Sequence, residues 1–339
     1  MPLRVGILSA AHMHVSSYAQ AFSTNARSEL VGIWDDDRPR AEAISTRFKC
    51  PVFSEIEPLL KECDAVVITS ENSRHAELGQ MAAAAGKHIL CEKPLTISEE
   101  QASAMLGAVD KAGVHLMTAF PCRFAPSYTR LRERVRKGEI GKIKAVCGTN
   151  QGRCPFGWFV ERDKSGGGSM IDHVVHVADL LRDLLGEDPV RVYAQVGNNM
   201  YGQDWEDSAM LSLDFPSGAF ATIDSSWSRP ASYKTWGGVT MNVVGEGGVV
   251  EMNMFNQNLD LFSNDDNFHS QAGFGSNADS LMIEEFLDAV FENRSPAVTG
   301  RDGLMAARVA WAGYESAKSG QPAEMSSQSP RLLPTASSA

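Results

Sequence analysis

The stretch Gly86–Pro94 reads Gly-Lys-His-Ile-Leu-Cys-Glu-Lys-Pro. Its middle part, His88–Cys91, is typical of a short strand buried on both faces, and this strand ends abruptly at an acid, a lysine and a proline. In an open α/β sheet, ligands bind just beyond the carboxyl ends of the strands. We therefore expect Lys93 to point its ammonium group into a ligand crevice, although by residue type alone a surface lysine before a turn proline is the commoner case.

Strand-like and helix-like segments alternate from the N-terminus to about residue 120. The expected strands are Leu3–Leu8, Leu30–Trp34, Ala65–Thr69, His88–Cys91 and Val114–Thr118. The expected helices are Val15–Thr24, Pro39–Phe48, Ile56–Lys61, His75–Ala85 and Glu99–Lys111. This alternation predicts βαβ units and a parallel sheet, so we assign residues 1–122 to a Rossmann-type dinucleotide-binding domain and the chain to the α/β class.

The pattern changes after Phe124. Consecutive strands joined by short turns predict a largely antiparallel sheet, with helices near Met170–Leu185, Asp279–Glu292 and Gly303–Ser319. We therefore expect residues 123–325 to form an α+β domain for substrate binding. Residues 326–339 are rich in Ser and Pro, which predicts a disordered tail.

The composition restricts the partners of the 339-residue chain. Its formal net charge of -11 argues against nucleic acid and against anionic membrane surfaces, because no basic stripe exists to neutralise phosphates. No secretory signal pattern is evident, and no apolar run approaches the roughly 20 residues of a membrane helix. None of the six cysteines has CxxC spacing. We expect a cytoplasmic protein that acts on a small molecule.

The usual dinucleotide fingerprint, G-x-G-x-x-G, is missing after the first strand. The small residues Ser9, Ala10 and Ala11 still permit close approach of a pyrophosphate, and a helix N-terminus follows. Asp35 ends the second strand, where an acid can bind the ribose hydroxyls of NAD, or can be only a turn acid. It predicts NAD, and the nearby arginines at positions 38 and 40 leave NADP as the less favoured cofactor.

Two histidines, His12 and His14, occupy the same loop. They could bind a metal ion, donate to the pyrophosphate or the substrate, or simply be packed or solvated. The sequence places no carboxylate or cysteine beside them, so we predict no metal site.

A second group of chemically active residues opens a helix after a glycine run at 166–168. Asp172 and His176 are four residues apart, so they lie on one helix face within reach of a common ligand. An imidazole can remove a hydroxyl proton while a hydride leaves the same carbon. His173 and Asp179 raise a metal alternative, but the spacing supplies no complete zinc ligand set. A satisfied structural histidine is the plainer alternative.

Taken together, these motifs resemble the glucose-fructose oxidoreductase / inositol dehydrogenase (Gfo/Idh/MocA) family of sugar and cyclitol dehydrogenases. The resemblance extends to about residue 323. The matching positions are Asn72, His75, 85–88, Cys91-Glu92-Lys93-Pro94, Phe120, Arg123-Phe124, 166–168, Asp172, His176 and 300–321.

The resemblance implies roles for individual residues. Lys93 would hold the reacting hydroxyl, with a cis Lys93–Pro94 peptide, Asp172 would bind the substrate, and His176 would be the general acid/base. The cofactor side would comprise Ser9, Ala10, Ala11, His12, Asp35, Ser70, Asn72, His75, Glu92, Lys93 and Arg123. The substrate side would add Trp158 and His173 to Lys93, Asp172 and His176. Arg123 is equally typical of a salt bridge, and Trp158 of a core residue.

We therefore expect an NAD-dependent oxidoreductase acting on a hydroxyl of a carbohydrate, assembled as a homodimer or homotetramer through the open face of the second sheet, as the resemblance implies. A cofactor-binding sensor without turnover is the main alternative, because the glycine fingerprint is altered. An enzyme that uses NAD-assisted elimination or glycoside cleavage is another.

Overall fold

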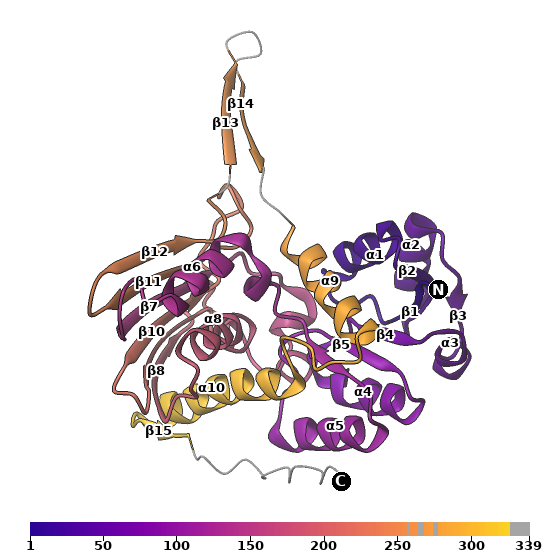
Figure 1. The fold of residues 1–339 in the computed structure, drawn as a ribbon, viewed down its shortest axis with the longest axis horizontal. Helices are drawn as coiled ribbons and strands as arrows, with labels where there is room; N and C mark the ends of the chain where they lie inside the picture. The colour runs from indigo at the N-terminus through magenta and orange to yellow at the C-terminus, as the bar shows by residue number, and fades with distance from the viewer. Residues whose placement is uncertain (257, 264–267, 274–276, 326–339) are drawn as a thin grey trace.

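A six-stranded parallel sheet is built from residues 3–118 of the computed structural model, which describes residues 1–256, 258–263, 268–273 and 277–325 (Figure 1). From edge to edge its strands are β3 (Val52–Phe53), β2 (Ser28–Trp34), β1 (Leu3–Leu8), β4 (Ala65–Ile68), β5 (His88–Cys91) and β6 (Leu116–Thr118). Every neighbouring pair is parallel. The order reverses between β1 and β4, the switch point at which doubly wound sheets bind ligands. The prediction of a Rossmann-type sheet is confirmed.

Helices cover both faces of this sheet. They are α1 (Val15–Thr24), α2 (Arg38–Phe48), α3 (Ile56–Glu62), α4 (His75–Ala84) and α5 (Glu99–Ala112), with a 3₁₀ turn η1 at Asn72–Arg74. Alternate strand residues face opposite ways, so Ile7 packs with Val15 on one side, while Leu8 packs with Leu59 on the other. Each fully buried aliphatic side chain contributes about 1.5–3 kcal/mol.

The last strand of the sheet is shorter than its sequence predicted. Gly113 ends α5 in the left-handed region at φ 65°, and the amide of Val114 still bonds back to the Val109 carbonyl at 3.4 Å. Val114 therefore still belongs to the end of the helix, and the strand begins at Leu116 rather than at Val114.

The second half of the chain forms a seven-stranded mixed sheet. Its order is β12 (Val249–Asn253), β11 (Val239–Gly245), β7 (Ile143–Gln151), β10 (Phe220–Ser226), β9 (Ser208–Asp214), β8 (Arg191–Gly197) and β15 (Ala323–Glu324). All its pairs are antiparallel except β7–β10, so the predicted largely antiparallel sheet is confirmed with one parallel pair. Sequence reasoning missed β15.

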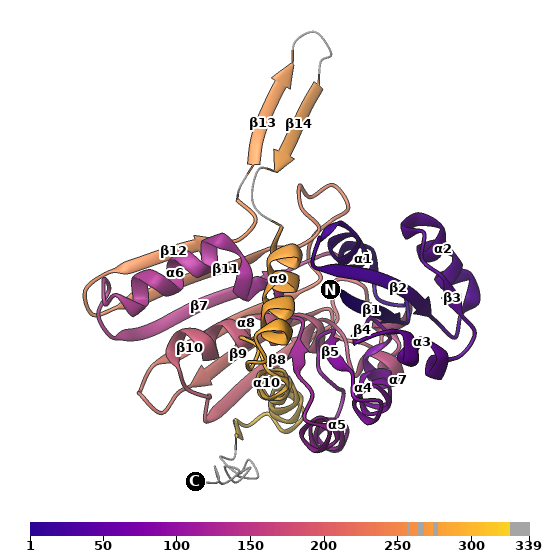
Figure 2. The ribbon, with the colours of Figure 1, turned by 45° about the vertical axis from the view of Figure 1, so that its right-hand side comes forward.

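The buried face of this sheet packs against α8 (Ser169–Leu185) and α10 (Gly300–Ser319) (Figures 1 and 2). Glycines permit the tight entry to α8. A Cβ at Gly167 would lie 1.9 Å from the Tyr314 hydroxyl, and one at Gly168 would lie 2.2 Å from the Glu206 carbonyl oxygen. The glycine run therefore fixes where α8 begins, and with it the positions of the side chains that α8 carries.

The remaining elements connect the two sheets or project from them. They are η2 (Pro121–Phe124), α6 (Pro126–Arg136), η3 (Gly157–Val160), α7 (Arg162–Ser165), α9 (Ala278–Phe291) and the hairpin β13 (Asn258–Ser263) with β14 (Phe268–Gly273). Figure 2 shows the hairpin standing away from both sheets. The sequence predicted a strand at Leu259–Phe262, within β13, and none at β14. The predicted disordered tail, 326–339, lies outside the described residues.

The second half of the chain also packs on the first sheet. Phe286 of α9 contacts Phe22 of α1 edge to face at 6.5 Å, and Thr299 pairs with Met117 beside β6. The division into residues 1–122 and 123–325 thus remains a prediction about chain segments. Within the described residues, no helix has the length and apolar character required to cross a bilayer.

Candidate active site

A cavity of about 820 Å³ lies at the carboxyl ends of the parallel strands, facing the second sheet. Side chains from distant segments line it: His12 and His14 after β1, Lys93 after β5, and the first turns of α8. The glycine-led entry of α8 aims Asp172, His173 and His176 into the same space. This is where the topology of an open α/β sheet predicts a ligand site.

Lys93 and Asp172 form a buried ion pair in this cavity. The Lys93 Nζ lies 2.6 Å from Asp172 Oδ1 and 3.3 Å from the Asp172 carbonyl oxygen. Trp227 donates from its indole to Asp172 Oδ2 at 3.1 Å, and His173 Nε2 lies 3.2 Å from the same oxygen. Burial alone would raise the pKa of Asp172, but Lys93 and then His173 outweigh it and hold that pKa well below its usual value. The carboxylate therefore stays ionised and fixes the ammonium group in place.

His176 lies one helical turn beyond Asp172 and lines the same cavity. Burial, and next the charge of Lys93, lower the pKa of His176 well below its ordinary value. Its Nδ1 lies 3.7 Å from the Cys122 Sγ, and its ring packs edge to face on Phe120 at 5.7 Å. A neutral, oriented imidazole can accept a proton from a hydroxyl group in the cavity.

The Ser9–His14 loop forms a tight turn without the usual glycines. Ser9 adopts φ 72°, in the left-handed region that a glycine normally occupies, and its hydroxyl donates to Asp35 at 3.2 Å. The amide of Ala10 donates to the same carboxylate oxygen at 2.5 Å. Helix α1 begins directly after this loop, and a helix N-terminus can receive a phosphate. These features fit a dinucleotide pyrophosphate.

Asp35 lies at the end of β2, as predicted, but its carboxylate already has a cationic partner. Arg40 Nη2 lies 2.7 Å from Asp35 Oδ1, and Arg40 Nη1 lies 3.3 Å from Glu71 Oε1. Burial would raise the pKa of Asp35, while the bonds from Arg40 and from two backbone amides lower it overall. A ribose hydroxyl would share this carboxylate with Arg40.

Glu92 is fully buried between the two loop histidines. Its Oε1 lies 2.9 Å from His14 Nδ1 and 3.5 Å from His12 Nδ1, and its Oε2 accepts the Lys93 amide at 3.0 Å. Burial would raise the pKa of Glu92, but the two histidines and Lys93 lower it. Burial lowers the pKa of His12 to about 3, whereas Glu92 outweighs burial at His14 and raises its pKa.

Three predicted cofactor residues do not line the cavity but bond to backbone carbonyls near it. His75 Nδ1 lies 2.9 Å from the Pro94 carbonyl, and the Lys93–Pro94 peptide is cis, as expected. Asn72 donates to the Ser165 carbonyl at 2.8 Å, which ties the first sheet to the segment before α8. The buried Ser70 hydroxyl donates to the Glu71 carbonyl at 3.0 Å.

Two predicted residues lie elsewhere. Arg123 binds both carboxylate oxygens of Asp179, at 2.6 and 2.7 Å. Its guanidinium therefore forms a buried salt bridge, which was the alternative to a cofactor contact. Trp158 donates to the Ala11 carbonyl at 3.0 Å and stacks on Phe159 at 3.9 Å. Phe159, rather than Trp158, lines the cavity, so a substrate contact by Trp158 stays a prediction.

Sequence reasoning missed four contributors to the site. Trp227 and Cys122 hold Asp172 and His176, and Asn150 receives His173 Nδ1 on its carbonyl at 3.1 Å. Asp279, at the start of α9, also lines the cavity. Only three-dimensional proximity identifies these residues, because none belongs to a local motif.

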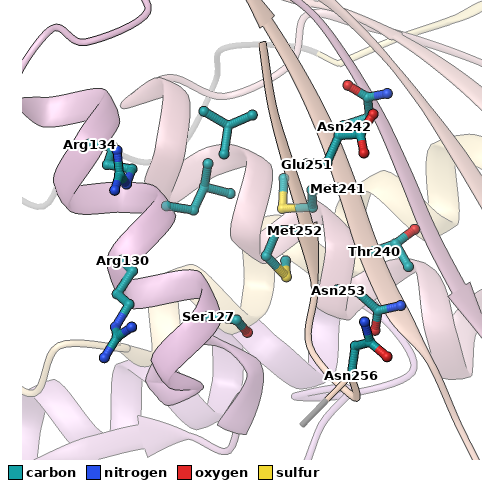
Figure 3. A pocket seen from close by; sticks show the side chains of 12 residues that line it. Ser127, Arg130, Arg134, Thr240, Met241, Asn242, Glu251, Met252, Asn253 and Asn256 are labelled. Atoms are coloured by element: carbon teal, nitrogen blue, oxygen red, sulfur yellow. The ribbon is translucent and has the colours of Figure 1, made fainter.

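A second cavity, of about 710 Å³, lies between α6 and the strands β11 and β12, of which β12 forms the edge of the sheet (Figure 3). Arg130 and Arg134 face Glu251 and several asparagines across it. The twelve side chains that line it include no imidazole, lysine or thiol, so it offers no acid–base pair like that of the first cavity.

Comparisons with known proteins agree with this geometry. The profile described as "Oxidoreductase family, NAD-binding Rossmann fold" matches residues 3–120, and that of the "GFO/IDH/MocA C-terminal domain" matches residues 128–251. The chain belongs to the Gfo/Idh/MocA family. It is accordingly an oxidoreductase with an NAD-binding Rossmann fold.

Two relatives of this chain are named as cyclitol dehydrogenases. The chain is 32% identical to the inositol 2-dehydrogenase of Rhizobium meliloti (strain 1021), with 93% of this chain and 97% of the relative covered. It is 29% identical to the NAD(+)-dependent scyllo-inositol 2-dehydrogenase of Bacillus subtilis (strain 168), with 88% and 89% covered. The fold matches that of GenD2 from gentamicin A biosynthesis, solved with NAD, at a TM-score of 0.87 and 24% identity, with 96% and 97% covered.

Proposed function

We propose that this chain is an NAD(H)-dependent dehydrogenase that oxidises a hydroxyl group of a sugar, a cyclitol or a sugar derivative. The observation that carries the proposal is the Lys93–Asp172 ion pair beside a neutral His176, in a cavity at the carboxyl ends of the Rossmann strands. The named activities of the two cyclitol dehydrogenases support the substrate class.

The catalytic roles follow from charge and position. The Lys93 ammonium group donates to the substrate oxygen and stabilises the negative charge that develops there, while Asp172 prevents Lys93 from leaving the cavity. His176 accepts the hydroxyl proton on a ring nitrogen during oxidation and returns it during reduction. Bound NAD⁺ supplies the hydride acceptor. In our proposal Ser9–Ala11, the α1 N-terminus and Asp35 hold the cofactor, and His173 orients Asp172.

The alternative function, a sensor without turnover, rested on the missing glycine fingerprint. Ser9 takes the left-handed conformation that the first glycine would take, so the altered sequence still provides the turn. This observation favours an enzyme.

A homo-oligomer in the cytoplasm completes the proposal. The outer face of the second sheet exposes large apolar side chains, among them Tyr193, Met210 and Phe220, and a second copy of the chain would cover them. All six cysteines are free thiols, as in a reducing compartment.

The test is a titration of the purified protein with NADH and with NADPH, followed by nicotinamide fluorescence. Saturable NADH binding at least about tenfold tighter than NADPH binding is expected, because Asp35 would repel a 2′-phosphate. Preference for NADPH would shift the cofactor assignment to Arg40. Failure to bind either cofactor would contradict the proposal.

A further inference from the structure

We propose that His12, His14 and Glu92 form a binding site for a divalent transition-metal ion of the zinc class. The sequence argued against a metal because no carboxylate stands near the two histidines in the chain. The fold supplies one, because β5 ends beside β1 and brings Glu92 between the two imidazoles.

The geometry of the three side chains is close to that of a metal site. One nitrogen of each imidazole and one Glu92 oxygen all lie within 4.8 Å of one another. The oxygen is 2.9 Å from His14 Nδ1 and 3.5 Å from His12 Nδ1. Zinc bonds of about 2.0–2.2 Å in tetrahedral geometry separate neighbouring ligand atoms by roughly 3.3 Å. The two carboxylate–imidazole contacts, at 2.9 and 3.5 Å, each differ from this separation by only a few tenths of an ångström.

The backbone holds this cluster in position before any ligand binds. The His12 amide donates to the Thr69 carbonyl at 2.9 Å, and the Glu92 amide donates to the Ile68 carbonyl at 3.0 Å. Glu92 Oε2 accepts the Lys93 amide, which fixes the orientation of the carboxylate. Metal sites depend on such supporting bonds for their ligand geometry.

The bonding of His12 is incomplete within the protein. Its side chain is only 2% exposed, and its Nε2 has no hydrogen-bond partner among the described residues. Its Nδ1 receives the His14 amide over a long 3.2 Å contact. An ion bound at Nδ1, the nitrogen nearest to Glu92, would replace this long contact, and the unpaired Nε2 would then be left to donate to a ligand in the cavity.

The charges of the surroundings favour a cation. Glu92 is a fully buried carboxylate, and the nearest ammonium group, that of Lys93, is already neutralised by Asp172 at 2.6 Å. Two imidazoles and one carboxylate suit Zn²⁺, Co²⁺ or Fe²⁺ better than Mg²⁺ or Ca²⁺, which prefer oxygen ligands.

The site opens on the catalytic cavity, because His12 and His14 both line it. Three protein ligands with one open position are typical of catalytic rather than structural zinc. The open position would take a water or an oxygen of a vicinal diol, which a cyclitol or sugar provides. The metal-binding inference does not rest on the proposed function, since proton transfer by His176 and charge stabilisation by Lys93 need no metal.

The test is direct metal binding by the full-length protein after chelator dialysis, without cofactor or substrate. We expect one equivalent of Co²⁺ to give the intense visible absorption of a low-coordinate N/O site, and Zn²⁺ to displace it. His14→Ala and Glu92→Gln should each weaken binding at least about tenfold. The matched control is His115→Ala, because His115 stacks on His88 at 5.0 Å outside the cavity and should not affect the equivalent bound.

Several outcomes would overturn the site. Absence of saturable Co²⁺ or Zn²⁺ binding by the wild-type protein would show that the cluster is a hydrogen-bonded His–Glu–His group only. Equal binding by wild type and His14→Ala would place the metal elsewhere. The His14 side chain is 16% exposed whereas that of Glu92 is fully buried, so His14→Ala is the variant expected to fold if Glu92→Gln does not. NADH binding, measured separately on the metal-free protein, tests the proposed function independently.

Discussion

Replacement of Lys93 by Met tests the central ion pair because it removes the ammonium group and retains much of the side-chain volume. Lys93 and Asp172 are 6% and 12% exposed at their side chains and 2.6 Å apart. Removal of one partner of a buried pair costs about 3–5 kcal/mol. We expect the lower end of this range, because Trp227 and His173 still contact Asp172.

The pH dependence of the loss identifies its cause. Lys93 is the largest of the influences that lower the pKa of Asp172, so without it burial would raise that pKa. A carboxyl with a raised folded pKa loses stability as pH rises. The free energy of unfolding of Lys93→Met should therefore fall further below that of the wild type as the pH increases above the ordinary carboxyl range. The double variant Lys93→Met/Asp172→Asn should recover most of the stability, because no unpaired charge remains buried.

The assays are urea denaturation across this pH range and steady-state turnover. We expect both the single and the double variant to lose about 10²–10⁴-fold in kcat. The control is Lys87→Met in the same stretch, since Lys87 donates to the Cys63 carbonyl at 2.9 Å, outside the cavity. The reasoning would be refuted if Lys93→Met lost less than about 1 kcal/mol of stability and kept a near-normal kcat. It would also be refuted if the stability losses of the two substitutions were additive in the double variant.

Three further predictions follow from single contacts. Trp227→Phe removes one bond to Asp172 and should lower kcat by about tenfold with little effect on NADH affinity; unchanged kcat in steady-state assays would contradict this. Arg40→Ala frees Asp35 and removes the cation nearest to it, so NADH preference over NADPH should increase at least about tenfold in fluorescence titrations; an unchanged ratio would show that Arg40 does not influence cofactor choice. Burial lowers the pKa of His12 from 6.5 to about 3, so protonation of His12 favours the unfolded chain. The free energy of unfolding should therefore fall as the pH drops through this interval, by on the order of 1 kcal/mol at about pH 5.5. In denaturation curves, His12→Asn should show a smaller acid loss than wild type, and an equal loss would contradict the assignment.

Local patterns were sufficient for much of the account. The alternation of strand and helix predicted the parallel sheet, and the four-residue spacing placed Asp172 and His176 on one face of α8. Lys93 was identified because a lysine after a buried strand must lie at the carboxyl edge of the sheet. Each of these inferences depends on periodicity or on adjacency within the chain.

Contacts between distant segments could not be predicted in the same way. Lys93 reaches Asp172 across 79 positions, and Trp227 reaches it across 55. Glu92 joins His14 across 78 positions, so the sequence suggested two histidines without a carboxylate. The packing of one sheet against the other determines these pairs. The same packing places Trp158 over the cofactor loop rather than in the cavity.

The most direct test of the dehydrogenase account is NADH formation by the purified wild-type protein and by His176→Ala. Both proteins are given NAD⁺ and a panel of cyclitols, aldoses and glycosides, and their NADH affinity is measured in parallel. We predict saturable NADH formation with at least one panel member, reduced about 10²-fold or more in His176→Ala while NADH affinity is retained. Unreduced turnover in His176→Ala, or NADH binding without turnover of any panel member or its ketone, would contradict the account.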